Sequence, residues 1–397
     1  MHIDVNNAFL SWTAIDLLNK GYGIDIRTIE AVIGGDENQR KGIVLAKSPI
    51  AKKKGVKTAE TLRDARRKCS NLKIYPPNQK WYNKMSTAVF EIVSSYTPDI
   101  EIVSVDECFI DYTGVYKMYG EPIQFAYKLK DEIYTKLGFT VNIGVANNKL
   151  CAKMASDFEK PNKVHALFDN EIVEKMYPLE IRDLYGIGKK SAEKLRELKI
   201  LTIGDLACTK HEYLYKYFKN QAGCLIDRAK GLDKSQVITE SEERKGISNS
   251  TTLPYNLTKN DEILFNLQKL VESVCIKLRR ENKYGHVVGV KIRDKHFYTY
   301  SHQRKLVNAT NNTEEVFKVA KELLLEMWNE EPIRLLGVSI TNLDDKPKRQ
   351  MSLFEVEDDI IKNDVLEKTV DNLKYTYGTN IIKRASLVDR EMTKKNK

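Results

Sequence analysis

The chain has 397 residues, of which 42% are hydrophobic and 30% charged, and its formal net charge is +10. This length is too great for one compact core, so we expect about two to four domains. No apolar run approaches the roughly 20 residues that span a bilayer, and Asp4 and Asn6 interrupt the N-terminus before a signal peptide forms. We therefore expect a cytosolic protein without membrane segments, whose positive charge favours a polyanionic partner such as nucleic acid.

The first 165 residues alternate between strand and helix patterns. In chain order the predicted elements are a strand at 2–5, a helix at 8–20, a strand at 43–46, helices at 61–69 and 82–96, strands at 101–105 and 108–112, a helix at 122–137, a strand at 140–145 and a helix at 147–158. The acidic pair Asp106-Glu107 falls at the turn between two strands that we expect to pair as antiparallel neighbours. This order favours an α+β sheet with helices on one face.

The rest of the chain divides by composition into three further parts. Residues 171–231 combine short helical patterns with many Lys and Arg residues and predict a small helical domain, and the polar stretch 233–249 is typical of a linker. An α+β pattern then returns, with a predicted helix at 264–280, strands at 287–293 and 297–300, a helix at 314–328 and a strand at 333–340. Beyond residue 344 the chain is polar apart from the run 351–354, and we expect a flexible tail.

Three carboxylates are the candidate metal ligands. Asp4 lies near the end of the first strand, and Asp106 and Glu107 lie at a turn that apolar strands precede and follow. An oxygen-only site of this charge suits Mg²⁺, and two such ions about 4 Å apart would activate a 3′-hydroxyl and stabilise a leaving pyrophosphate. An isolated Asp-Glu pair is more often a solvated turn. The flanking strands favour the site, because three carboxylates placed together repel one another unless a cation neutralises them.

Three other features fit a protein that binds phosphates or docks through a peptide, each with a plainer alternative. Lys52 and Lys160 are candidates to contact a triphosphate as point charges, although each alone is more often a surface lysine. The segment Gly186-Ile187-Gly188-Lys189 resembles a helix-hairpin-helix turn, whose glycines let the backbone approach a DNA phosphate; the alternative is a plain glycine turn. The segment 350–354 is typical of a peptide-docking anchor, unless its apolar side chains pack back on the body.

Taken together, these residues resemble the Y-family (translesion) DNA polymerases of the bacterial DinB/UmuC class, over residues 1 to about 354. The segments that carry the resemblance are His2-Ile3-Asp4-Val5-Asn6-Asn7-Ala8-Phe9, Ser104-Val105-Asp106-Glu107-Cys108-Phe109-Ile110-Asp111, Asn142 through Asn162, the glycine turn Gly186–Gly188, and Gln350-Met351-Ser352-Leu353-Phe354. The second is the most specific of them. The last looks like the pentapeptide that binds the bacterial sliding clamp.

The resemblance implies a right-hand polymerase. Its predicted parts are a ferredoxin-like palm at 1–17 and 72–165, small fingers at 18–71, a helix-hairpin-helix thumb at 166–232, a linker at 233–249, an α+β little finger at 250–345, and a flexible tail at 346–397 that contains the clamp peptide 350–354. The implied activity is template-directed, error-prone DNA synthesis past damaged bases without proofreading. The implied partners are primer-template DNA, a dNTP and the sliding clamp, and we expect a monomer.

The resemblance also assigns residues to roles. Asp4, Asp106 and Glu107 would hold two Mg²⁺ ions with help from the Val5 carbonyl, and Phe9 falls at the steric-gate position, where its ring would clash with a ribose 2′-hydroxyl. The remaining implied contacts are Lys52 and Lys160 for the triphosphate, Gly186, Gly188 and Lys189 for DNA phosphates, and Gln350, Leu353 and Phe354 for the clamp.

Some positions depart from the family pattern. Lys52 stands where an Arg is common, so it binds phosphate without bidentate geometry, and Pro49 stands where a Tyr hydroxyl is common. Asn6 replaces a second acid of some members and is not predicted as a ligand. Because only three residues precede Asp4, we expect the true start of the chain to lie upstream. A catalytically silent, clamp-docking accessory subunit is the alternative function, which the intact acids disfavour; a nucleotide cyclase has no use for the thumb turn or the clamp peptide.

Overall fold

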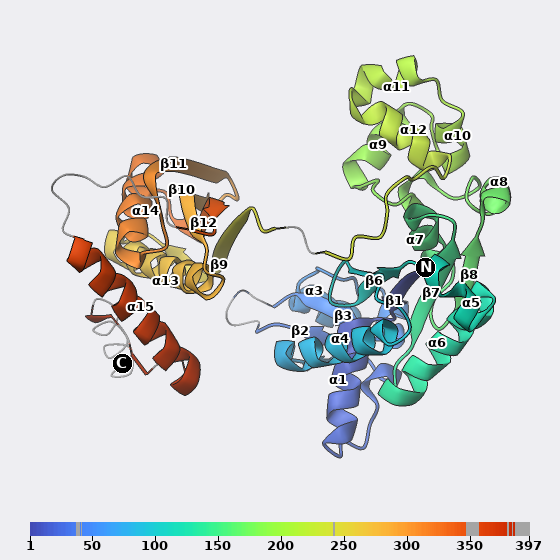
Figure 1. The fold of residues 1–397 in the computed structure, drawn as a ribbon, viewed down its shortest axis with the longest axis horizontal. Coiled ribbons are helices and arrows are strands. Elements are labelled where there is room, and N and C mark those ends of the chain that lie inside the picture. Colours follow the sequence, from blue (N-terminus) through green and yellow to red (C-terminus); the bar gives the residue numbers. More distant parts are fainter. Residues whose placement is uncertain are drawn as a thin grey trace. The chain divides into compact units, whose positions relative to one another are not determined.

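The computed structural model describes residues 1–36, 40, 42–240, 243–346, 357–378, 381–382 and 384–385, with only the backbone for 357–364. The chain divides into two compact units: Met1–Glu37 with Gly42–Ser241, and Asn38–Lys41 with Glu242–Lys397. Figure 1 shows their helices and strands, and each unit is taken by itself below. Within the described ranges, no helix combines the length and the apolar composition that crossing a membrane requires.

The first unit contains a five-stranded sheet in the order β5-β6-β1-β7-β8. Its strands are β1 (His2–Val5), β5 (Ile100–Ile102), β6 (Glu107–Ile110), β7 (Val141–Ala146) and β8 (Val164–Leu167). The central strand β1 is antiparallel to both β6 and β7, whereas β7 and β8 run parallel. This agrees with the predicted strands and extends them by β8, a strand that the sequence patterns did not indicate.

Helices cover both faces of this sheet, so the predicted one-sided arrangement is wrong. The helices around it are α1 (Ala8–Asn19), α4 (Gln79–Ser94), α5 (Tyr116–Tyr119), α6 (Pro122–Leu137) and α7 (Lys149–Asp157), with 3₁₀ turns η1 (Ile26–Thr28) and η3 (Thr113–Val115). Ile3 and Val5 share a core with side chains of α1, α4 and α6, whereas His2 and Asp4 contact α7 on the other face. A Cβ at Gly144 would lie 1.9 Å from the Ala152 carbonyl oxygen, so this glycine permits the close approach of α7.

A second, three-stranded sheet in the same unit has the order β3-β2-β4. Its elements are β2 (Ala31–Gly34), β3 (Val44–Lys47), α2 (Pro49–Lys53), α3 (Leu62–Lys68) and β4 (Lys73–Tyr75). Strand β3 and helix α3 were predicted, while β2 and β4 are too short for a clear period-2 pattern. Pro49 occupies the first turn of α2 behind the Ser48 cap, where its fixed φ and missing N–H are compatible with a helix start.

The helical part of this unit spans the region predicted as a small helical domain. Its elements are 3₁₀ turns η4 (Asp169–Glu171) and η5 (Ile181–Asp183), and helices α8 (Ile172–Lys175), α9 (Lys189–Glu197), α10 (Ile203–Ala207), α11 (His211–Phe218) and α12 (Gln221–Ala229). Their apolar faces share one core with Leu150 and Met154 of α7. The helical part therefore packs directly against α7, the helix that faces Asp4.

The second unit is a four-stranded antiparallel sheet with two long helices. Its elements are β9 (Gly246–Leu257), α13 (Asn260–Arg280), β10 (Tyr284–Asp294), β11 (Thr299–Thr310), α14 (Thr313–Met327) and β12 (Ile333–Asp344), in the sheet order β11-β10-β12-β9. Strand β9 begins inside the predicted linker 233–249, because Gly246 pairs with Thr341 of β12. Strand β11 continues ten residues beyond the predicted end at 300, because its mostly polar side chains hide a strand pattern.

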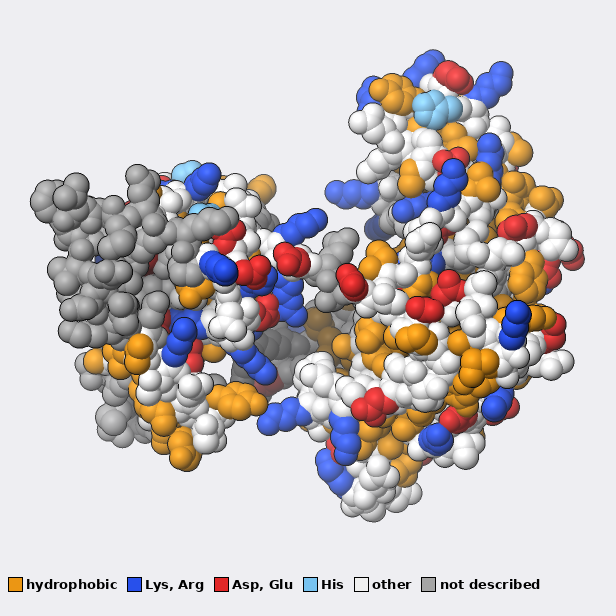
Figure 2. Space-filling view, in the orientation of Figure 1, with side chains coloured by type: hydrophobic (Ala, Val, Ile, Leu, Met, Phe, Trp, Pro, Cys, Tyr) orange, Lys and Arg blue, Asp and Glu red, His pale blue; other side chains and the backbone are white. Residues whose placement is uncertain are grey.

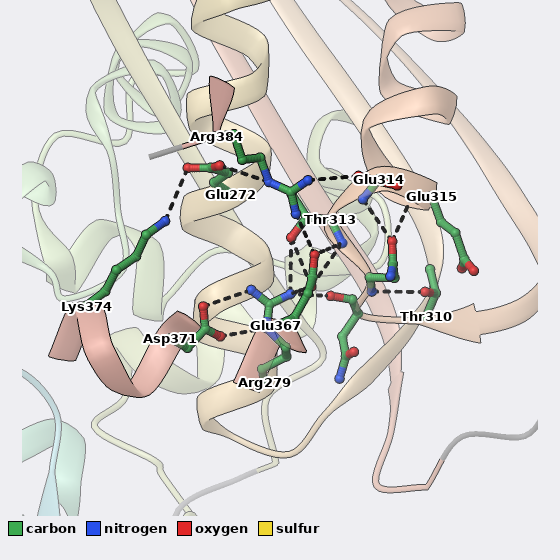
Figure 3. Close-up of polar contacts among 12 residues, drawn as sticks. Glu272, Arg279, Thr310, Thr313, Glu314, Glu315, Glu367, Asp371, Lys374 and Arg384 are labelled. Atoms are coloured by element: carbon green, nitrogen blue, oxygen red, sulfur yellow. Dashed lines mark hydrogen bonds and ion pairs between the residues drawn. The ribbon is translucent and has the colours of Figure 1, made fainter. Parts of the chain in front are cut away.

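The tail predicted to be flexible contains a helix, α15 (Glu357–Tyr377), which docks on the second unit. Arg279 of α13 donates to Glu367, and it donates to Asp371 Oδ2 at 2.6 Å and to the Asn311 carbonyl at 2.8 Å. Figure 3 shows Glu367 and Asp371 pointing toward this guanidinium, with Arg384 beside Glu367. A polar sequence does not exclude ordered structure when its charges find buried partners, so the prediction is corrected for α15.

Candidate active site

The backbone of the first sheet places Asp4 beside Glu107, with Asp106 in the adjoining turn. Asp4 of β1 lies opposite Glu107, the first residue of β6, in the antiparallel register. Asp106 precedes Glu107 in the turn, and its carbonyl accepts a hydrogen bond from the Val5 N–H at 3.0 Å. Pairing of β1 with β6 therefore positions the acids, as the strand patterns indicated.

Two lysines pair with the acids on the α7 side of the sheet. Lys153 Nζ lies 2.9 Å from Glu107 Oε1 and 3.6 Å from Asp4 Oδ2. Lys160 Nζ lies 3.0 Å from Asp4 Oδ1 and 2.7 Å from Asp157 Oδ1. The structure thus places Lys160 beside Asp4. It also places Lys153 at the acids, a residue that the sequence analysis missed. The sequence signal that could have indicated its burial is its position among small and apolar residues of a helix.

The charge states of this cluster follow from its burial. Burial raises the pKa of Asp4, although Lys160 and Lys153 oppose this effect. His2 and Lys153 lower the pKa of Glu107 to about 2, so its carboxylate is ionised near neutral pH. Burial lowers the pKa of His2, whose Nε2 lies 3.5 Å from Glu107 Oε2 without a hydrogen-bond partner. A buried nitrogen and two carboxylates therefore face a small region that favours positive charge.

Asp106 is held differently from the other two acids. The Ser104 hydroxyl donates a hydrogen bond to Asp106 Oδ1 at 2.6 Å, and the Asp106 N–H donates to the Ser104 oxygen at 3.3 Å. Among the described residues, there is no group of three or more Asp, Glu, His or Cys side chains close enough together to hold a metal ion. Lys153 therefore forms ion pairs with both Asp4 and Glu107, whereas the Asp106 carboxylate is hydrogen-bonded to Ser104.

Phe9 lies in the first turn of α1, half-buried beside the acidic strand. Its ring stacks on that of Tyr82 with a centroid distance of 4.8 Å and an interplanar angle of 16°. The Tyr82 hydroxyl in turn shares a 2.7 Å hydrogen bond with Thr13. These contacts fix one face of the Phe9 ring, so the ring has few alternative orientations.

Asn6 connects the acidic strand to the segment around Lys160. Its amide donates to Asn142 Oδ1 at 3.0 Å, and its own oxygen accepts from the Asn162 N–H at 2.8 Å. Both ends of the side-chain amide are thus engaged in protein hydrogen bonds. These bonds help to hold Lys160 at the edge of the acidic cluster.

Lys52 is exposed on α2, and the structure gives it no contact with Asp4 or Lys160. Burial, and then the charge of Lys52, lower the pKa of Lys47 at the end of β3, which places two like charges near each other. The Asn7 side chain donates to the Lys47 carbonyl at 2.8 Å and so connects this small sheet to the start of α1. Two neighbouring ammonium groups form a local positive field, which attracts phosphate.

The glycine turn before α9 has the backbone of an open phosphate site. Gly186 has a φ of +90°, in the region that favours glycine, and Gly188 is the N-cap of α9 in an extended conformation. Lys189 begins the helix and its side chain is exposed. The free N–H groups at this helix start and the adjacent lysines fit a phosphate. The predicted clamp residues Gln350, Leu353 and Phe354 lie outside the described residues.

Positive and negative side chains are both present on the surface of each unit. On the face drawn in Figure 2, Lys and Arg side chains lie among Asp and Glu on both units, without one continuous basic patch.

Comparison with known proteins gives matches along most of the chain. The model of the impB/mucB/samB family matches residues 3–157, the model of that family's C-terminal domain matches 244–353, and the model of its helix-hairpin-helix motif (IMS family HHH motif) matches 169–200. DNA polymerase IV of Clostridium acetobutylicum is 43% identical over 390 residues, which cover 98% of each chain. DNA polymerase IV 1 of Bacillus subtilis is 31% identical over 396 residues, covering 99% of this chain and 94% of the relative.

Solved structures of Y-family polymerases have the same fold. A Dbh–Dpo4 chimera superposes with a TM-score of 0.76 at 24% identity and covers 87% of this chain and 99% of the chimera. DinB from Sulfolobus solfataricus gives a TM-score of 0.57 at 25% identity, covering 86% and 98% respectively. The right-hand arrangement with a helix-hairpin-helix thumb is confirmed by these likenesses.

Proposed function

This chain belongs to the impB/mucB/samB family of Y-family DNA polymerases, in the DNA polymerase IV (DinB) class, and from that premise we propose how its own residues carry DNA synthesis. It is a DNA-directed DNA polymerase of the translesion type. We assign the palm to 1–17 and 72–165, the fingers to 18–71 and the thumb to 166–232. The little finger begins at Gly246, where β9 starts, instead of at 250.

The acidic cluster fits a hard divalent cation. Asp4 and Glu107 supply carboxylate oxygens from facing positions of two paired strands, and Asp106 precedes Glu107 in the turn, where its carboxylate would have to leave Ser104 to join them. These acids, with the Val5 carbonyl, would hold two Mg²⁺ ions, which would activate the primer 3′-hydroxyl and stabilise the leaving pyrophosphate. The observation that carries this assignment is the register of Asp4 opposite Glu107, together with the lysines that now balance their charge.

The cationic residues around the cluster serve the nucleotide and the DNA. Lys160 is held at the cluster by Asp4 and Asp157, and it would exchange these carboxylates for a triphosphate oxygen. Lys52, with Lys47 near it, provides a second positive charge on the fingers. The turn Gly186–Gly188 and Lys189 would bind a backbone phosphate of primer-template DNA. Such contacts position the duplex without reading its sequence.

Extension of a labelled primer on templates with and without defined damaged bases tests the function. The wild-type chain with Mg²⁺ and dNTPs should extend the primer and pass at least one lesion of the panel. A chain that binds the primer-template but never extends it would instead fit the accessory-subunit alternative, which no structural feature now favours. A nucleotide cyclase would have no use for the thumb or the little finger, so that alternative is also disfavoured.

Phe9→Ala should raise the incorporation of ribonucleotides. The ring held by Tyr82 would lie under the sugar and clash with a 2′-hydroxyl, and alanine removes that clash. We expect the ratio of dNTP to rNTP incorporation efficiency to fall by about a hundredfold, since about 3 kcal/mol separates the two sugars when a hydroxyl is excluded sterically. Single-nucleotide insertion with each triphosphate measures the ratio. Thr13→Ser, which keeps the hydroxyl that bonds Tyr82, is the control; unchanged sugar discrimination in Phe9→Ala refutes the gate.

Residues 350–354 would bind the bacterial sliding clamp, with the chain itself a monomer. Replacing both Leu353 and Phe354 by Ala should abolish the stimulation of synthesis by the clamp, because two apolar anchors of a short peptide carry most of its affinity. Primer extension with and without loaded clamp measures the effect, and synthesis without clamp should be unchanged. Stimulation that persists in the double variant would show that docking occurs elsewhere.

A further inference from the structure

Lys153 is a buried cation at the active site to which neither the sequence patterns nor the family resemblance gave a role. Its side chain is 10% exposed, in the middle of α7, and its ammonium lies 2.9 Å from Glu107 and 3.6 Å from Asp4, with a longer contact of 3.9 Å to Asp157. Asp4 and Glu107, 12% and 26% exposed, come from the two strands that carry the proposed metal ligands. Ions that are taken out of water require close partners of opposite charge.

The other lysine at this site is placed for a different task. Lys160 is 36% exposed, and its ammonium divides its contacts between Asp4 and Asp157 near the surface. It can therefore leave Asp4 at little cost in solvation. Lys153 is more deeply buried, at 10% exposed, and its contact with Asp157 is, at 3.9 Å, the longest of its three. Of the two, Lys153 is the fixed charge.

We propose that Lys153 is a built-in counter-ion, a positioning residue that holds Asp4 and Glu107 together in the metal-free polymerase and weakens their affinity for divalent ions. This inference deepens the proposed function, because it rests on Asp4 and Glu107 as metal ligands. One ammonium shared by two carboxylates lowers their mutual repulsion in the absence of metal. The same positive charge repels an incoming cation, so metal binding has to compete with Lys153.

This arrangement has a consequence for the order of assembly. A site that binds ions weakly by itself gains affinity when a nucleotide triphosphate adds its own negative charge and oxygen ligands. Lys153 would thus favour ion binding together with the nucleotide over ion binding to the free enzyme. The acids stay preorganised meanwhile, since their strand register and the ammonium fix them before the ions arrive.

The test compares Lys153→Met with the wild-type full-length chain in two measurements that do not use activity. In EDTA, the thermal midpoint of Lys153→Met should fall by at least about 4 °C, because two poorly solvated carboxylates lose a partner. In a titration with Mn²⁺ alone, followed by electron paramagnetic resonance of the free ion, its affinity should rise about tenfold or more. A structural lysine would predict loss of stability without gain of metal affinity.

Two further variants separate charge from packing. Lys163→Met removes an exposed lysine near the site that pairs with Glu159, and it should change neither measurement. Lys153→Met combined with Glu107→Gln removes one charge of each sign, so its midpoint in EDTA should recover above that of Lys153→Met, even if the single variant is poorly folded. No recovery, or an unchanged Mn²⁺ affinity in Lys153→Met, overturns the proposal. If neither protein binds Mn²⁺, the metal site of the proposed function fails and the proposal fails with it, whereas Mn²⁺ binding by Lys153→Met alone supports both.

Discussion

Asp106→Ala and Glu107→Ala should each reduce the rate of primer extension at least about a thousandfold. Each variant removes a proposed ligand of the ions that stabilise the developing charge, an effect of several kcal/mol, and about 4 kcal/mol corresponds to a factor of roughly a thousand in rate. Initial rates with a 5′-labelled primer and saturating Mg²⁺ measure the loss. The affinity for primer-template DNA should remain close to that of wild type, because the thumb turn is untouched.

The control for these variants is Glu159→Ala. Glu159 is an exposed acid two residues from Asp157, and its carboxylate lies 3.7 Å from the Lys163 ammonium, so it shares the sequence region of the site without pairing with its lysines. It should extend primers at nearly the wild-type rate. Comparable extension by Asp106→Ala, Glu107→Ala and wild type would remove the acids from the site. Their positions on β6 would then have to be structural.

The acids could be predicted from sequence because local patterns determine their positions. An apolar strand on each side of Asp106-Glu107 indicated a hairpin, and this hairpin forms one edge of the sheet next to the central strand β1. The alternation of Ile3 and Val5 with His2 and Asp4 then directs the acids away from the main core. These are short-range rules, and the family resemblance in the same residues strengthened them.

The features that sequence analysis missed depend on contacts between distant segments. Lys153 falls in an amphipathic helix, and only the pairing of β1 with β7 shows that its face meets Asp4. Strand β9 starts in a polar stretch because it pairs with β12 there, and no local sequence pattern indicates that pairing. Lys47 was overlooked because its neighbour Lys52 matched the family position. In each case the feature depends on a tertiary contact, which cannot be read from a single sequence.

Helix α15 shows the same limitation in energetic terms. Its sequence is polar, so it lacks the apolar face from which helix packing is usually predicted. The docked face instead carries Glu367, Asp371 and Lys374, whose partners Arg279 and Glu272 lie about ninety residues earlier on α13. A charged helix that docks through ion pairs is indistinguishable, in sequence, from a solvated one.

The second large effect is expected at Arg279. Arg279→Met should destabilise the little finger by about 3–5 kcal/mol, the usual cost of removing one partner of a buried ion pair. Its guanidinium, 6% exposed, contacts Glu367 and Asp371, which are 11% and 17% exposed and would be left without it. Glu367 also accepts the Thr313 N–H at the start of α14 at 3.3 Å, so the loss extends to that helix start. The thermal midpoint of the full chain should fall by on the order of 10 °C.

Hydrogen exchange identifies where that loss of stability occurs. Amides of 365–377 should lose protection in Arg279→Met if the ion pairs hold α15 on α13, while the palm sheet keeps its protection. Arg280→Met is the matched control, because the neighbouring arginine is exposed and contributes a contact with the Tyr375 ring at 5.6 Å, worth under about 1 kcal/mol. Combining Arg279→Met with Glu367→Gln and Asp371→Asn removes the unpaired charges, so part of the stability should return. Equal effects of the two arginine variants, or protection of 365–377 that survives in Arg279→Met, would mean that α15 is held by its packing and not by its charges.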